Sequence, residues 1–135
     1  MLAIGPLTQP ESLALYDFTL AHNFKLILSY HTQGEIIYWR YLDFEPVGAE
    51  RLGEEFARVS TYILDDEKET NSYAGYRDWY ISKYNLPGYT IETGKGQNPL
   101  PITQFEQIYK DNIGILILAA TKYQNYRFNI DMSQK

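Results

Sequence analysis

Residues 87–96 read Pro-Gly-Tyr-Thr-Ile-Glu-Thr-Gly-Lys-Gly, a short strand pattern between turn residues that ends in the carboxylate Glu92. A second apolar run, residues 26–30, delivers His31 to a turn in the same way. Open α/β sheets gather their reactive groups at the carboxyl ends of strands, so the two runs predict one shared cleft. On strand geometry alone, a plainer interpretation is preferred, in which Glu92 is a solvated strand end and His31 a polar edge residue.

Helical patterns alternate with these strands. The first is predicted from a capping box at Thr8 and Glu11, with Leu13, Tyr16 and Leu20 on one face. The other predicted elements are helices over 48–64, 74–85 and about 103–123, strands over 25–31, 35–41 and 89–92, and an optional edge strand at 126–130.

Five ordered segments, 23–31, 37–39, 72–79, 89–94 and 98–101, resemble the C-terminal half of a zinc carboxypeptidase domain. Within that family they are most similar to the bacterial γ-D-glutamyl-diamino acid peptidases that act on cell-wall peptides. The resemblance implies an α/β fold, with a mixed sheet and helices packed on both faces. It covers nearly the whole chain, so residues 1–135 are predicted to form a single partial domain.

The resemblance also implies roles for individual residues. His31 matches a zinc ligand, and Glu92 matches the general base that takes a proton from water and returns it to the leaving amine. Tyr73 matches the mobile tyrosine that covers the substrate, with Tyr76 as the competing assignment. Asp78 matches a residue of the substrate-binding pocket. Zinc is the implied cofactor and a peptide the implied substrate.

The chain departs from the family upstream of these residues. It has only two histidines, His22 and His31, and no His-x-x-Glu pair, whereas a hydrolytic zinc site needs three protein ligands. Three explanations stay open: a fragment of a longer reading frame, half of a split enzyme that assembles with an upstream complementing half, or an inactive remnant. We expect the isolated chain to bind zinc weakly or not at all, and a half sheet to offer an edge for self-association.

Composition narrows the possible partners. The net charge of −5 and the absence of a long apolar run argue against nucleic-acid and membrane partners. The chain lacks cysteine, which is compatible with either redox environment. No secretory signal pattern is visible at its start, and the cytoplasm is the favoured location. Its 13 tyrosines support an alternative hypothesis, a non-catalytic binding module with a tyrosine-lined cleft.

Overall fold

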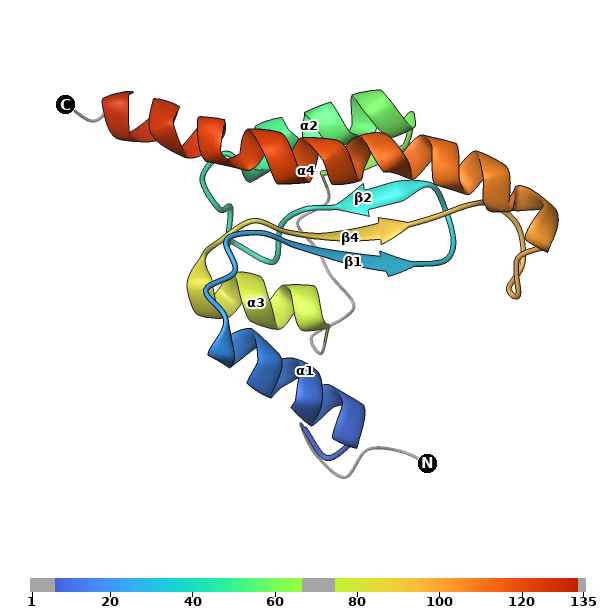
Figure 1. Cartoon of the computed structure of the whole chain (residues 1–135), viewed down its shortest axis with the longest axis horizontal. Coiled ribbons are helices and arrows are strands. Elements are labelled where there is room, and N and C mark those ends of the chain that lie inside the picture. The colour runs from blue at the N-terminus through green and yellow to red at the C-terminus, as the bar shows by residue number, and fades with distance from the viewer. Residues whose placement is uncertain (1–6, 67–74, 134–135) are drawn as a thin grey trace.

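A four-stranded mixed sheet lies between two pairs of helices (Figure 1). The computed structural model describes residues 7–66 and 75–133. The elements are α1 (Pro10–Ala21), β1 (Ile27–His31), β2 (Ile36–Tyr38), α2 (Ala49–Ser60), β3 (Ile63–Asp65), α3 (Tyr76–Tyr84), β4 (Gly88–Glu92), a 3-10 turn η1 (Ile102–Gln104) and α4 (Phe105–Ser133). The predicted fold class, a mixed sheet with helices on both faces, is confirmed.

The strands follow the order β1-β4-β2-β3. The central strand β4 pairs in parallel with β1 and antiparallel with β2, and β2 pairs in parallel with β3. β1 therefore stands at one edge of the sheet, and its carboxyl end lies beside that of β4 (Figure 1).

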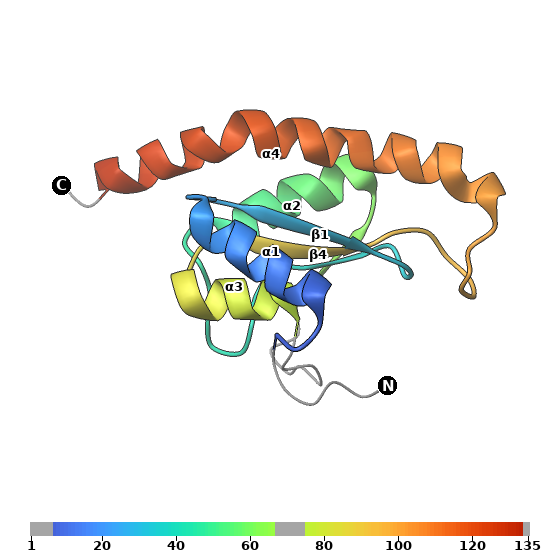
Figure 2. The same cartoon turned by 60° about the horizontal axis from the view of Figure 1, so that its bottom comes forward.

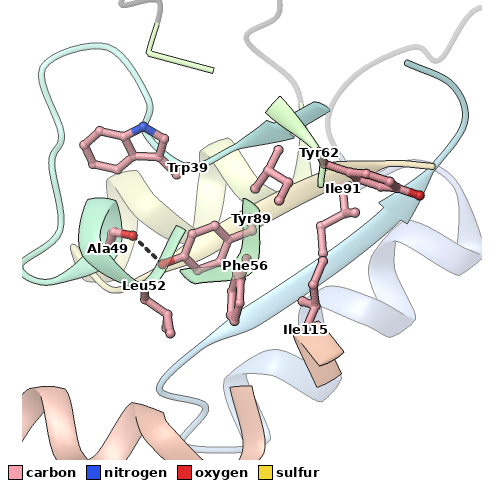
Figure 3. Close-up of a cluster of buried hydrophobic side chains, with 9 residues drawn as sticks. Trp39, Ala49, Leu52, Phe56, Tyr62, Tyr89, Ile91 and Ile115 are labelled. Atoms are coloured by element: carbon pink, nitrogen blue, oxygen red, sulfur yellow. Dashed lines mark hydrogen bonds between the residues drawn. The ribbon is translucent and has the colours of Figure 1, made fainter. Parts of the chain in front are cut away.

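One face of the sheet is sealed by α2 and α4, which lie together over it (Figure 2). Tyr89 and Ile91 of β4 project into this layer and are fully buried, together with Phe56 of α2 and Ile115 of α4 (Figure 3). Ile37 of β2 belongs to the same buried cluster. The Tyr89 hydroxyl donates a hydrogen bond to the Ala49 carbonyl at 2.7 Å, so even the polar tip of this ring is satisfied inside the core. We refer to this side as the sealed face.

The opposite face carries α3 and α1. α3 packs on β4 and β1, and α1 is attached to α3 through aromatic contacts such as that between Tyr16 and Trp79, whose ring centroids lie 5.2 Å apart. Leu13 and Leu20, which were predicted on one helix face with Tyr16, are 44% and 46% exposed. Only the Tyr16 side of the helix meets α3, and Thr19 is its one buried residue.

Two predicted elements differ from the structure. The helix predicted over 48–64 ends at Ser60, whose hydroxyl bonds to the Phe56 carbonyl, and β3 follows instead. The predicted edge strand at 126–130 is wrong, since α4 continues to Ser133 through a segment without Gly or Pro.

The predicted helix caps are also wrong. Gln9, not Thr8, holds the position before α1, and Thr103 lies inside η1 rather than at the cap of a long helix. No helix in the described ranges combines the length and apolar character needed to cross a bilayer.

Candidate active site

His31 and Glu92 are the last residues of two neighbouring parallel strands and are direct register partners. Side chains alternate between the faces of a strand, and Ile91 points into the sealed face. Glu92 and His31 therefore project together from the opposite face, the one that carries α3. The pairing of β1 with β4 thus sets the backbone positions of His31 and Glu92 side by side.

The Glu92 carboxylate is partly buried, and one of its oxygens is unusual. Oε2 is shielded from solvent and has no hydrogen-bond partner within the described residues. A buried carboxylate oxygen is costly unless a donor or a cation meets it. This oxygen is therefore the group at the strand ends that is best placed to interact with a bound molecule.

His31 has a fixed backbone and an exposed ring. Its carbonyl oxygen accepts two hydrogen bonds from Thr93, one from the backbone N–H at 2.9 Å and one from the Oγ1 hydroxyl at 3.0 Å. Thr93 itself is buried, whereas the His31 side chain is exposed. Thr93, which follows the candidate base Glu92, thus holds the backbone of the candidate ligand His31 in position.

The loops after the two strands are joined beside the site. Gly34 donates its N–H to the Gly94 carbonyl at 2.8 Å, and the Thr32 hydroxyl donates to the Asn98 side-chain oxygen at 2.9 Å. Gly94 has φ +70°, and a Cβ there would come within 2.6 Å of a Leu100 methyl group, so this turn requires glycine. These bonds define the shape of the strand ends.

An ion pair closes the same loops. Lys95 Nζ lies 2.5 Å from a Glu35 carboxylate oxygen, and this hydrogen bond raises the pKa of the exposed Lys95 ammonium. Lys95 and Asn98 therefore have partners within the loops.

The remaining predicted site residues come from or near α3. The Tyr76 hydroxyl lies 2.8 Å from the Thr19 hydroxyl, and its ring stacks on Trp79. Asp78 is buried and accepts a hydrogen bond from Arg77 Nε at 2.8 Å. Tyr73 lies outside the described residues. The structure thus brings His31 and Glu92 together and places Tyr76 and Asp78 on the helix over the same face of the sheet.

Arg77 was not among the predicted site residues. This buried guanidinium lies 5.6 Å from the ring centroid of Tyr38, whose side chain is on the same face of the sheet as Glu92. A cation in the first turn of a helix opposes the helix dipole and so needs a compensating partner. The adjacent charges of Arg77 and Asp78 at a helix start were the available signal.

The described residues do not complete a metal site by themselves. Within residues 7–66 and 75–133, no three His, Cys, Asp or Glu side chains gather closely enough to hold a metal ion. His31 and Glu92 fit one ligand and one neighbouring carboxylate, which is fewer than the three protein ligands that zinc requires.

Two known proteins are similar in sequence to most of this chain. No family model matches it. Over 113 residues, 84% of the chain, it is 47% identical to gamma-D-glutamyl-L-diamino acid endopeptidase 1 of Lysinibacillus sphaericus. It is also 47% identical, over 113 residues, to the uncharacterized protein YqgT of Bacillus subtilis (strain 168). The chain spans 28% and 30% of the lengths of these two relatives. The sequence is therefore related to a peptidase, of which it covers less than a third.

Proposed function

We propose that this chain is the part of a zinc metallopeptidase that carries one metal ligand, His31, and the general base, Glu92. The proposed substrate class is the γ-D-glutamyl peptides of the cell wall. The similarity to a relative named as an endopeptidase for such a bond supports the reaction class. The resemblance to zinc carboxypeptidases supports the roles of the two residues.

The observation that carries the proposal is the register of β1 and β4. It sets His31 and Glu92 side by side on one face, and Glu92 Oε2 is buried without a partner among the described residues. A carboxylate held in this way can accept a proton from an attacking water molecule and return it to the leaving amine. Thr93 holds the neighbouring backbone, so the separation of the two groups is defined before substrate binds.

Zinc does not fit the residues of this chain alone. One imidazole beside one carboxylate leaves the coordination short of protein ligands, and exchangeable water would occupy the remainder. Zinc binding is therefore proposed only for the chain together with further ligands. The chain's own contribution is to position His31 and to hold and move a proton at Glu92.

Substrate contacts are proposed for Tyr73, Tyr76 and Asp78. The Tyr76 hydroxyl is engaged by Thr19, so contact with substrate requires that this bond break. Asp78 is paired with Arg77 and both are buried, so contact with the carboxylate and the amine of a substrate requires that this pair be uncovered. A diamino acid peptide has both groups, which is consistent with the name of the relative.

The test combines this chain with the remainder of the Lysinibacillus sphaericus relative, the part outside the 113 matched residues. Zinc stoichiometry and cleavage of a γ-D-glutamyl-L-lysine peptide are measured for wild type, His31→Ala and Glu92→Gln. We expect His31→Ala to reduce bound zinc, and Glu92→Gln to retain zinc while cleavage falls by a factor of about 10² to 10⁴.

His22→Ala is the matched control, since His22 is the chain's other histidine and bonds to the Phe18 carbonyl at the end of α1. It should leave zinc binding and cleavage unchanged. Equal activity in wild type and Glu92→Gln would remove the general-base assignment.

A further inference from the structure

Three aromatic rings at the junction of α1 and α3 surround one ammonium group. Lys83 Nζ lies 5.7 Å from the ring centroid of Trp79 and 5.8 Å from that of Tyr84, both on α3. It lies 6.0 Å from the ring centroid of Tyr16 on α1. At these distances the negative face of an aromatic ring attracts a cation. The three rings together are called the aromatic cage below.

Contacts among the rings hold the aromatic cage together, and they do not involve Lys83. The Trp79 ring packs against that of Tyr16 with centroids 5.2 Å apart, and it meets Tyr84 edge to face at 5.9 Å. On its other side, Trp79 stacks on Tyr76, whose hydroxyl is hydrogen-bonded to that of Thr19 on α1. The two helices lie side by side (Figures 1 and 2). The arrangement of the rings therefore does not depend on the ammonium between them.

The aromatic cage lies at the surface and away from the candidate active site. Lys83 is exposed, Tyr84 is 36% exposed, and the other two rings are partly buried. A ligand can therefore reach the ring faces when Lys83 moves aside, without any opening of the core. The cage is near the carboxyl end of α3, from which the chain passes to the start of β4, whereas Glu92 is at the end of that strand.

The aromatic cage holds its own lysine weakly. Among the described residues, no carboxylate and no hydrogen-bond acceptor contacts the Lys83 ammonium, so the rings are its neighbours. A cation–π contact at an exposed site is a weak interaction, and the four-carbon stem of lysine is flexible. The ammonium can therefore exchange the rings for water, and a competing cation can take its place.

The lack of an acceptor among these residues determines which cation fits best. A primary ammonium has three N–H donors, and those turned toward the rings lose water without gaining a partner. A quaternary ammonium has no N–H group, and its methyl groups bury apolar surface against the rings. Recognition of such ligands is the usual role of aromatic rings grouped in this way.

We propose that the aromatic cage is a binding site for a small molecule that carries a quaternary ammonium group, with Lys83 as its occupant in the free protein. Binding displaces the Lys83 ammonium into solvent and sets the methylated head of the ligand against the three rings. The inference is independent of the proposed function, because none of these four residues takes part in the peptidase chemistry.

The test is an NMR titration of the chain with choline and with its neutral analogue, in which a carbon atom replaces the charged nitrogen. The chain has two tryptophans, of which Trp39 is buried. We expect choline to shift the indole N–H signal of Trp79 and to leave that of Trp39 in place. Choline should bind about fivefold more tightly than the neutral analogue, the gain that a cation–π contact provides at an exposed site.

Three variants change the aromatic cage. Lys83→Gln removes the resident cation and should raise the affinity for choline by a factor of about 2 to 5, because the ligand no longer competes with it. Trp79→Leu removes the central ring and should abolish the preference for choline over the neutral analogue. Tyr84→Leu should reduce that preference, and it keeps the test valid if circular dichroism shows that Trp79→Leu disturbs the fold.

Two controls on α4 match these variants. Lys110→Gln removes a cation from an exposed residue, and Tyr109→Leu removes a ring that is 57% exposed. Both should bind choline as wild type does. A peptide that contains trimethyllysine is titrated in the same way, to distinguish a small molecule from a modified protein as the source of the ammonium.

A choline-dependent shift of Trp79 that strengthens in Lys83→Gln supports the proposal. The proposal is overturned if choline and the neutral analogue bind equally in wild type and Lys83→Gln, or if loss of the cage rings leaves choline binding unchanged. A Lys83→Gln variant that is less stable and gains no affinity also overturns it, because the ammonium would then only join two helices. Tighter binding of the trimethyllysine peptide than of choline refutes the small-molecule ligand. Peptide cleavage by the reconstituted enzyme tests the proposed function separately.

Discussion

The two 12-residue helices α1 and α2 have opposite relations to the sheet. α2 places Leu52 and Phe56 against the strands and buries them almost completely. α1 is richer in apolar side chains, yet its only buried residue is Thr19. Apolar content therefore does not tell how well a helix is covered. The sealed face is complete within this chain, and the α1 side has the composition of a core but not its burial.

The largest expected effect comes from breaking the sealed face. Phe56→Ala should lower the free energy of unfolding by about 3–5 kcal/mol, since a fully buried ring in contact with Tyr89 is lost and a cavity remains. Phe18→Ala on α1, where the ring is 53% exposed, should change it by about 0.5 kcal/mol or less. Urea denaturation measures both. Equal losses would show that α1 is as well packed as α2.

The sequence was sufficient for the sealed face because its periodicity is unambiguous. Leu52 and Phe56 recur at helical spacing, and the strand that ends at Glu92 stands between clear turn residues. β3 was missed because Ile63 continues the spacing of the preceding helix, although the chain leaves that helix at Ser60. Periodicity shows which residues lie on the same side of a helix. It does not show where the helix ends when the next residues are apolar, because a longer helix and a following strand then fit the sequence equally well.

The site was predictable to a similar degree. The positions of His31 and Glu92 at strand ends follow from local pattern, but their register depends on which strands pair, a non-local property. Asp78 was predicted to bind substrate only through the resemblance, and Arg77 was not predicted at all; the packing of α3 on the sheet is what buries both.

A moderate loss of stability is expected from a substitution at Thr93, where the buried core meets the candidate site. Thr93→Val removes the Oγ1 hydrogen bond to the His31 carbonyl but keeps the backbone bond and the buried volume. The free energy of unfolding should fall by about 1 kcal/mol, the usual net value of one such bond. Thr103→Val, at an exposed residue of η1, is the matched control and should have little effect. An unchanged stability for Thr93→Val would mean that the backbone bond alone holds His31.

A similar test applies to the polar contact between α4 and the residue before β3. Asn112 donates hydrogen bonds to the Tyr62 hydroxyl at 2.9 Å and to the Ile108 carbonyl at 2.8 Å, and it is buried. Tyr62→Phe removes one acceptor and should cost about 1 kcal/mol of unfolding free energy, since a buried amide donor loses a partner. Tyr109→Phe, on the exposed side of α4, should cost less. Thermal unfolding measures both variants. Equal decreases in their unfolding temperatures would show that the hydrogen bond from Asn112 to Tyr62 does not contribute to stability.

The smallest effect is expected at Tyr30, which belongs to both regions because it lies on the open edge strand while its side chain faces the sealed side. Burial of the ring, followed by the proximity of Tyr62, raises the pKa of Tyr30 to about 12. Since this folded-state pKa exceeds the ordinary value near 10, the neutral phenol's contribution to stability is complete below pH 10 and is lost as the pH rises through about 12. The stability difference between wild type and Tyr30→Phe should therefore change only in this alkaline window, and the difference in absorbance at 295 nm between them should show a tyrosine that ionises late. Ionisation near pH 10 would mean that the Tyr30 ring is open to water and that its contact with the sealed face does not shield the hydroxyl.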